Sequence, residues 1–224
     1  MKNIKPSRAK WIFRLISING VYMCNYLYLF DLDSTITKVE ILPEISKMLG
    51  VEKEIRALTE ETMQGIIPFK HSFLKRVDIL GQTDVDKVRE MIAEIPLNEE
   101  IADFIRSNHD NCYVVTGNLD VWIEGLLERL NMIGHCYCSK AMVENNKISK
   151  VISVIDKGMQ VEQIVQPFVA VGDGDNDSVM AEKADIGIGF GAVREIAPSL
   201  MRTVDYAFYE EKRLVEFLNC LNRR

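Results

Sequence analysis

Five short, almost wholly apolar runs predict the strands of a buried parallel sheet. Runs of this kind are typical of strands that are covered on both faces. Each run ends at a glycine or a polar residue, and amphipathic segments of helical period lie between the runs. This alternation predicts an α/β fold, with a Rossmann-like parallel sheet core and right-handed crossovers. The predicted strands are 26–30, 112–115, 168–171, 186–190 and 206–209, and the predicted helices are 99–107, 119–131, 158–165, 177–184 and 210–221.

One long interval interrupts the alternation. Between residues 38 and 97 the chain has no strand pattern and carries four helical stretches, which glycine and proline residues separate. We therefore predict a small helical cap at 38–97, inserted into an α/β core made of 25–37 and 98–224. The helical stretches are 41–49, 53–63, 69–80 and 84–95, and a β-hairpin is predicted at 141–152 with its turn at Glu144-Asn145-Asn146.

The first residues, 1–24, form an extension whose structure the pattern leaves open. Basic residues are followed by an apolar stretch, Trp11 to Phe30, and this pattern resembles that of a signal peptide. Arg14, Asn19 and Asn25 interrupt that stretch, and no small-residue cleavage site follows it. A membrane-spanning helix would need about 20 uninterrupted apolar residues. We therefore expect a cytoplasmic protein without membrane association.

The composition and the net charge of the chain indicate which kinds of molecule it could bind. The chain of 224 residues is 47% hydrophobic and 27% charged, as is typical of a soluble globular protein. Lys and Arg total 27 against 33 Asp and Glu, which gives a net charge of −6, and no basic block follows residue 14. Nucleic acid is therefore not an expected partner, because binding to the phosphate backbone needs clustered cations.

The cysteines predict reduced thiols in a cytosolic protein. There are five of them, an odd number, and most lie in apolar runs. The run His135-Cys136-Tyr137-Cys138 resembles half of a zinc site, but no second Cys/His pair accompanies it. We therefore expect buried thiols at these positions and no zinc.

Polar residues replace apolar ones where three of the predicted strands end. They lie in Asp31-Leu-Asp33, in Thr116-Gly117-Asn118 and in Asp173-Gly-Asp175-Asn-Asp177. Ligands bind at the carboxyl ends of the strands in an open parallel sheet, so these side chains are expected to share one crevice. Carboxylates that lie close together raise one another's pKa unless a cation is present. Mg²⁺, which binds a few carboxylates, waters and a substrate phosphate, fits this requirement.

The run that begins at Asp173 has a second interpretation, because an EF-hand calcium loop also begins D-x-D-x-D. Counted from Asp173, position six is Ser178, where the loop requires glycine, and position twelve is Ala184, where it requires a bidentate Glu. A predicted strand, and not a helix, precedes the run. These differences argue against the calcium loop.

A phosphate group would find donors at the same edge of the sheet. Thr116 offers a hydroxyl, and the amides of Gly117 and Asn118 are expected to open a helix whose dipole favours an anion. Lys157 precedes another predicted helix and supplies a positive charge. Taken singly, Thr116-Gly117-Asn118 also fits a simple turn with a helix cap, and Lys157 fits a solvated lysine.

Taken together, these pieces resemble the haloacid dehalogenase superfamily of phosphohydrolases, from about residue 26 to the carboxyl end. The order and placement of the four motifs make the resemblance specific. The motifs are Asp31-Leu-Asp33-Ser-Thr35, Thr116-Gly117, Lys157 and Gly172-Asp-Gly-Asp-Asn-Asp177.

The resemblance implies a role for each acidic residue of these motifs. It makes Asp31 the nucleophile, which forms an aspartyl-phosphate, and Asp33 the general acid and then the base. It implies that Asp31, the main-chain carbonyl of Asp33 and Asp173 hold Mg²⁺. It also implies that Asn176 and Asp177 order the site. Asp177 is then one of the metal-binding residues, and Asn176 is one of the substrate-binding residues.

The predicted cap resembles that of the phosphoserine phosphatases. In that family, a Glu and an Arg that match Glu40 and Arg76 bind the amino and carboxylate groups of serine. Residues that match Met63 and Phe69 form an apolar lid. An Arg guanidinium can donate two parallel hydrogen bonds to a carboxylate, and a Glu carboxylate can accept a hydrogen bond from an ammonium group. Each of the four residues also fits a purely structural role.

The resemblance implies a Mg²⁺-dependent phosphomonoester hydrolase that forms an aspartyl-phosphate and converts phosphoserine to serine and phosphate, a reaction of serine biosynthesis. Two residues depart from the family pattern: Asn118 stands where a second glycine is common, and Asp175 where a small residue is usual. Two alternatives therefore stay open. One is a phosphatase or phosphotransferase for another small phosphorylated metabolite, and the other is a non-catalytic protein that binds a phosphorylated ligand.

Overall fold

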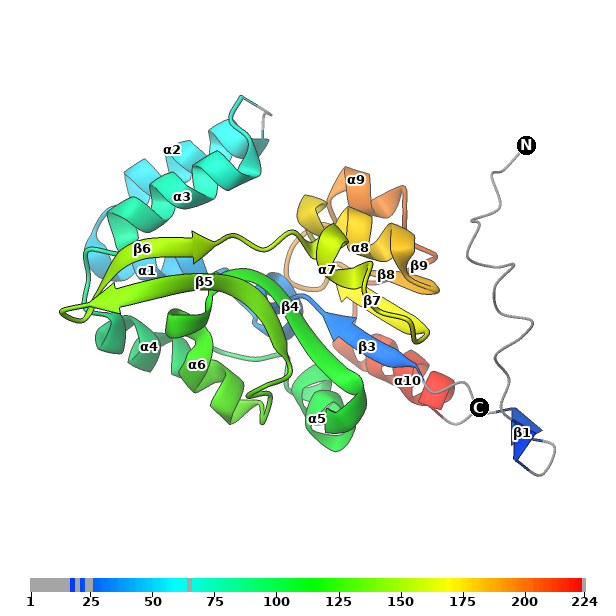
Figure 1. Cartoon of the computed structure of the whole chain (residues 1–224). Coiled ribbons are helices and arrows are strands. Elements are labelled where there is room, and N and C mark those ends of the chain that lie inside the picture. The colour runs from blue at the N-terminus through cyan, green and yellow to red at the C-terminus, as the bar shows by residue number, and fades with distance from the viewer. Residues whose placement is uncertain (1–16, 19–20, 23–25, 64–65, 223–224) are drawn as a thin grey trace.

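The structure is a computed structural model, which describes residues 17–18, 21–22, 26–63 and 66–222 (Figure 1). Its centre is a seven-stranded sheet in the order β6-β5-β4-β3-β7-β8-β9. Neighbouring strands run parallel, except that β6 is antiparallel to β5. The strands are β3 (Leu27–Phe30), β4 (Cys112–Leu119), β5 (Cys136–Glu144), β6 (Lys147–Ser153), β7 (Phe168–Gly172), β8 (Ile186–Phe190) and β9 (Tyr206–Phe208).

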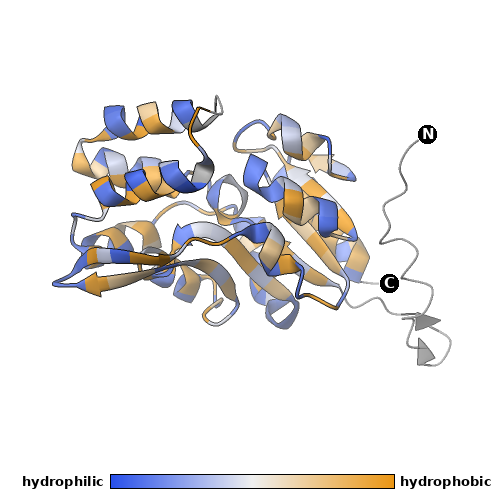
Figure 2. Cartoon of the chain, turned by 45° about the horizontal axis from the view of Figure 1, so that its top comes forward, coloured by the Kyte–Doolittle hydropathy of each residue, from blue (hydrophilic) through white to orange (hydrophobic). Residues whose placement is uncertain are grey.

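Helices cover both faces of this sheet, and the central strands are buried as their apolar runs predict. In β3, Tyr28 and Phe30 belong to the larger core cluster, whereas Leu29 between them belongs to a second cluster on the opposite face. Figure 2 shows mostly hydrophobic strands and helices with alternating hydrophobic and hydrophilic residues. The helices that contribute to the larger cluster from the core are α5 (Glu99–Ser107), α6 (Asp120–Arg129) and α10 (Glu211–Asn222), and those that contribute to the second cluster are α7 (Lys157–Val161) and α8 (Ser178–Lys183).

The five strands predicted from apolar runs are all present, which confirms the α/β sheet. The hairpin is also present, with Asn145 and Asn146 in its turn at φ of 51° and 61°. The apolar pattern did not predict the first half of β5. There the mixed sequence from Cys136 pairs in parallel with β4 and adds a strand to the sheet.

Several helix boundaries differ from the prediction, and the difference at the start of α6 affects the site. Strand β4 continues to Leu119, so α6 begins at Asp120 and the amides of Gly117 and Asn118 do not open a helix. Helix α7 ends at Val161, several residues before the predicted end. A short helix that the pattern did not predict, α9 (Pro198–Met201), follows β8.

The chain leaves the core after β3 and returns to it at one place. Thr37 and Leu97 form an isolated antiparallel bridge there. The amide of Lys38 donates to the carbonyl of Pro96 at 2.8 Å, and that of Asn98 to the carbonyl of Ile36 at 2.8 Å. The segment predicted as a cap therefore begins and ends at this stem.

The helices between the two sides of the stem do not all lie together. Figure 1 shows α2 and α3 side by side, away from the sheet, and the Ser72 hydroxyl donates to the Leu58 carbonyl between them. Helix α4 instead packs against α6, where Arg89 forms an ion pair with Glu124. The helices of this segment are α1 (Ile41–Leu49), α2 (Glu52–Met63), α3 (Phe69–Leu80) and α4 (Val85–Ala93).

Of the predicted extension 1–24, the structure describes only β1 (Ser17–Ile18) and β2 (Val21–Tyr22), which pair antiparallel. The rest of the extension, and with it most of the apolar stretch from Trp11, lies outside the described residues. Within the described part of the chain, none of the helices has the length and apolar character needed to cross a membrane.

Candidate active site

Three strands bring the predicted site residues to one edge of the sheet. Asp31 directly follows β3, Thr116 lies near the end of β4, and Asp173 directly follows β7. Since β3 pairs in parallel with both β4 and β7, these carboxyl ends are neighbours. Asp31, Thr116 and Asp173 are buried, with 5%, 0% and 1% of their surface exposed. The structure thus brings the three predicted strand ends together.

Lys157 joins two carboxylates of this group. It is the first residue of α7 and is only 4% exposed. Its Nζ donates to Oδ1 of Asp31 and, at 2.6 Å, to Oδ1 of Asp177. Burial acts to lower the pKa of Lys157, but the carboxylates of Asp177 and Asp31 outweigh burial and raise it. Lys157 is therefore a buried ammonium paired with two carboxylates, and the alternative of a solvated lysine does not hold.

Asp177 organises the loop after β7. Its Oδ2 accepts hydrogen bonds from the amides of Asp173 at 3.1 Å and Gly174 at 2.9 Å. A side chain at Gly172 would collide with the Asp177 carboxylate, because a Cβ there would lie 2.4 Å from it. The glycine therefore allows Asp177 to lie close to the strand end, with both of its oxygens bonded.

Asp31, Asp173 and Asp177 form a group that suits a divalent cation. One oxygen from each lies within 4.8 Å of the others. Oδ1 of Asp173 is buried and has no hydrogen-bond partner among the described residues. A buried polar atom without a partner costs about 1–3 kcal/mol. A cation bound to this oxygen would remove that cost, and carboxylate oxygens are the ligands that Mg²⁺ prefers, so these residues fit the metal.

The electrostatics of the group agree with this assignment. Burial, and then the Asp177 carboxylate, raise the pKa of Asp31 well above its usual range. Burial raises the pKa of Asp173 to about 7, although the Arg194 guanidinium acts in the opposite direction. Without a bound cation, Asp31 and Asp173 therefore hold their protons to higher pH than a free carboxyl group does.

The side chain of Asp33 accepts its hydrogen bonds from residues outside this group. Its Oδ1 accepts the Ile41 amide at 2.7 Å, and its Oδ2 accepts the Asn118 side-chain amide at 2.6 Å. Burial raises the pKa of Asp33, and the hydrogen bonds from Ile41 and Asn118 partly offset this. Asp31 and Asp33 therefore lie in different surroundings, as a nucleophile and a separate acid require.

The Thr116 hydroxyl has different neighbours from those that the sequence predicts. Its Oγ1 accepts the Asn118 backbone amide at 3.2 Å and the Asn118 side-chain amide at 2.9 Å. Both bonds use the oxygen as acceptor, so the Thr116 O–H can donate to a ligand. The expected helix start at Gly117 and Asn118 was wrong, because β4 continues through these residues, and the Asn118 amide donates to Thr116 instead.

The residues predicted to select the substrate lie on the segment after the stem. Glu40 directly precedes α1. Arg76 lies in α3, is 8% exposed, and donates from Nε to the Ser72 carbonyl at 3.4 Å. Burial lowers the pKa of Arg76, while the carboxylates of Glu40 and Asp33 act to raise it. These interactions place the guanidinium within electrostatic reach of Glu40 and Asp33.

Other predicted residues take no part in the described contacts. Met63 ends α2 and Phe69 begins α3, but their side chains lie outside the described part of the structure. Asp175 and Asn176 lie in the exposed turn between β7 and α8.

Sequence reasoning missed Arg194, which lies in the loop between β8 and α9. Its Nε donates to Oδ2 of Asp173, and its Nη1 lies 2.5 Å from Oε1 of Glu40. The amide of Ala197 in the same loop donates to the Asp173 carbonyl at 2.8 Å. The signal was available, because the loop follows the carboxyl end of a predicted strand, 186–190.

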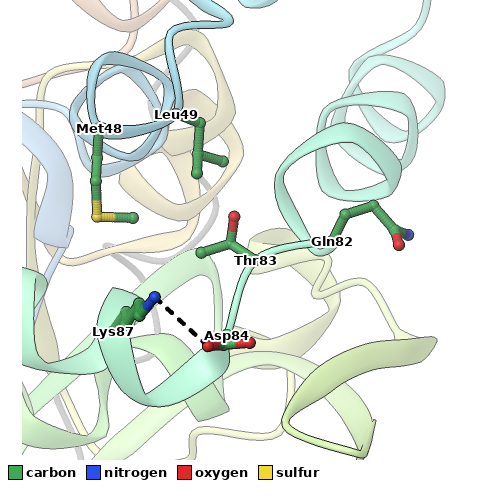
Figure 3. A pocket seen from close by; sticks show the side chains of 6 residues that line it. All are labelled: Met48, Leu49, Gln82, Thr83, Asp84 and Lys87. Atoms are coloured by element: carbon green, nitrogen blue, oxygen red, sulfur yellow. Dashed lines mark ion pairs between the residues drawn. The ribbon is translucent and has the colours of Figure 1, made fainter.

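Two further features lie apart from this chemistry. A pocket of about 400 Å³ lies between the end of α1 and the loop that leads into α4, with Lys87 and Asp84 paired at 3.7 Å on its wall (Figure 3). In the described part of the chain, no group of potential metal ligands includes a cysteine. The Nδ1 atom of His135 lies 3.1 Å from the Cys112 carbonyl oxygen.

Comparisons with known proteins show which proteins this chain is similar to. The phosphoserine phosphatase of Archaeoglobus fulgidus is 33% identical over 181 residues, which cover 74% of this chain but only 52% of the relative. That of Methanocaldococcus jannaschii is 32% identical over 181 residues, which cover 74% of this chain and 85% of the relative. A solved structure of a phospho-aspartyl intermediate analogue of phosphoserine phosphatase aligns with a TM-score of 0.71 and 27% identity, over 86% of this chain and 98% of that one.

The family model for haloacid dehalogenase-like hydrolases matches residues 28–182, which include all four sequence motifs. The match covers well over half of the chain and begins and ends within the sheet and helices described above. The chain therefore belongs to the haloacid dehalogenase-like hydrolases.

Proposed function

We propose that this phosphohydrolase cleaves a phosphomonoester through a phosphorylated Asp31, and that its substrate is phosphoserine. The observation that carries the proposal is the position of the Asp31 carboxylate. It is buried at the end of the central strand, bonded to Lys157, with oxygens of Asp173 and Asp177 within 4.8 Å. The related structure of a phospho-aspartyl analogue supports the same assignment.

The reaction has two steps. In the first, an oxygen of Asp31 attacks phosphorus, the bond from phosphorus to the ester oxygen breaks, and Asp33 gives its proton to that leaving oxygen. In the second, Asp33 takes a proton from water, the water oxygen attacks phosphorus, and the bond from phosphorus to Asp31 breaks. Phosphate leaves, and Asp31 and Asp33 return to their first states.

Positive charge stabilises the phosphoryl group in both steps. Lys157 and the Thr116 hydroxyl are the donors on this chain, and Gly117 lies beside them at the strand end. Asp31, Asp173 and the main-chain carbonyl of Asp33 would hold Mg²⁺, which when bound neutralises phosphoryl charge and orients the group for in-line attack. Asp177 completes the acidic group and holds Lys157 in place.

The side chains after the stem would recognise serine. We assign the substrate carboxylate to Arg76, whose guanidinium is buried and has a backbone carbonyl as its hydrogen-bond partner. We assign the ammonium to Glu40 and the apolar lid to Met63 and Phe69. Asn176, in the exposed turn beside the acidic group, is assigned to the substrate side.

A turnover panel of phosphorylated small molecules, with Mg²⁺ and with EDTA, tests this function. We expect phosphoserine to have the highest kcat/KM, with phosphate and serine released in equal amounts and no turnover in EDTA. A higher value for another ester would overturn the substrate assignment. Absence of turnover for every ester would favour a protein that only binds its phosphorylated ligand.

A further inference from the structure

Asn118 makes two short contacts that no motif predicts. It is 2% exposed and lies next to the last residue of β4. Its Nδ2 donates to Oδ2 of Asp33 at 2.6 Å and to Oγ1 of Thr116 at 2.9 Å. An ionised carboxylate only accepts hydrogen bonds, so this contact fixes which end of the Asn118 amide faces Asp33.

A second donor holds the same carboxyl group from the other side. The amide of Ile41, at the start of α1, donates to Oδ1 of Asp33 at 2.7 Å. One oxygen is thus held by the core strand β4 and the other by the first helix after the stem. Rotation of the Asp33 carboxyl group would break both bonds, so its orientation is fixed by the pair.

Many buried Asn residues only satisfy backbone groups, and this protein offers one for comparison. Asn98 is 3% exposed, and its Nδ2 donates to the Thr35 carbonyl at 2.9 Å. The acceptor of Asn118 is instead a carboxylate that exchanges protons in the proposed reaction. The contact also departs from the family pattern, in which a glycine at this place has no side chain to donate.

We propose that Asn118 is a positioning residue for Asp33. It holds the carboxyl group in the orientation in which Asp33 gives a proton to the leaving oxygen and later takes one from water. This inference rests on the acid and base role of Asp33 in the proposed function. The contact of Asn118 with Thr116 places the same side chain beside the phosphoryl donors, which ties the position of the acid to that of the phosphate.

Substrates with different leaving groups separate this role from a merely structural one. An alkyl phosphate such as phosphoserine loses an alkoxide unless its oxygen is protonated, so its cleavage depends on a well-placed acid. p-Nitrophenyl phosphate loses a stable phenolate and needs little protonation. General acid catalysis contributes about 10²–10⁴-fold, so a displaced Asp33 slows the alkyl ester selectively.

The experiment compares kcat/KM for these two esters, at one pH and saturating Mg²⁺, in the whole chain. The variants are Asn118→Ala and Asn118→Gly, with Asp33→Asn as the reference and Asn98→Ala as the matched control. We expect the ratio of the alkyl to the aryl value to fall roughly tenfold in both Asn118 variants and further in Asp33→Asn. Asn98→Ala is expected to leave the ratio unchanged, whatever its effect on stability.

The outcomes are distinguishable. If Asp33→Asn leaves the ratio unchanged, the acid role of Asp33 fails and the inference falls with it. A second outcome is that Asp33→Asn lowers the ratio, while the Asn118 variants either slow both esters equally or slow neither of them. In that case the proposed function stands and the inference about Asn118 is wrong. The double variant Asp33→Asn with Asn118→Ala gives a second test, because a residue that acts through Asp33 should add no further loss to the ratio.

Discussion

Arg194 holds one oxygen of Asp173, while the other oxygen of the same carboxylate has no hydrogen-bond partner among the described residues. The guanidinium also pairs with Glu40, so it links the end of β7 to the first residue before α1. Because Oδ2 is held, Oδ1 stays turned into the acidic group. Groups that orient a metal ligand in this way commonly affect metal affinity.

The first prediction concerns this arrangement. We expect Arg194→Gln to weaken Mg²⁺ binding about tenfold, because Asp173 loses the partner that fixes its orientation. Isothermal titration with Mg²⁺ alone measures the change. Arg213→Gln is the control, since Arg213 pairs with Glu216 on the exposed face of α10. Tighter Mg²⁺ binding in Arg194→Gln would instead show that the guanidinium competes with the metal.

The second prediction concerns the substrate carboxylate. We expect Arg76→Ala to raise KM for phosphoserine at least tenfold, because a charged hydrogen bond to the carboxylate is lost, at about 1.5–3 kcal/mol. A phosphate ester without a carboxylate should be affected much less. Lys75→Ala is the matched control, since Lys75 is the exposed neighbour of Arg76 in α3. An equal rise of KM for both esters in Arg76→Ala would refute the assignment of phosphoserine as the substrate. The proposal that the protein is a phosphatase would still stand.

The third prediction concerns pH. Burial raises the folded-state pKa of Asp31 and Asp33, and that of Asp173 to about 7, above the value of 3.8 of a free carboxyl group. The folded state therefore binds more protons than the unfolded state between about pH 4 and 7, and these groups make the metal-free protein less stable as pH rises. Mg²⁺ replaces the protons, so its stabilising effect should grow over the same interval.

Thermal unfolding at about pH 5 and pH 7.5, with EDTA and with Mg²⁺, measures this effect. We expect a larger increase of Tm by Mg²⁺ at the higher pH, and a smaller increase in Asp173→Asn than in the unaltered chain. The same Mg²⁺ effect at both pH values would contradict the assignment of the Asp31 and Asp173 carboxyl groups to the metal.

The sequence alone predicted the central sheet because its strands are buried on both faces and therefore apolar along their whole length. The same reasoning missed the first half of β5, whose Cys136 and Lys140 lie in a mixed run at a less buried part of the sheet. It also ended β4 too early, because a polar residue such as Thr116 or Asn118 does not by itself stop a strand.

The motif residues were predictable because each follows a strand, and parallel strands end at a common edge. Their mutual contacts were not. Asn118 meets Asp33 across 85 positions of the chain, and Arg194 meets Glu40 across 154. Such contacts depend on side-chain rotamers and on loops from different strands, about which local spacing carries no information.

The central claim is that phosphorus passes through Asp31, and trapping the acyl phosphate tests it most directly. The enzyme is mixed with phosphoserine and Mg²⁺, quenched in acid during turnover and reduced with borohydride, which converts an aspartyl-phosphate to homoserine. Peptide mass spectrometry should then find homoserine at position 31, and none in Asp31→Asn. Turnover without modification at position 31, or with modification at another carboxylate, would contradict the account.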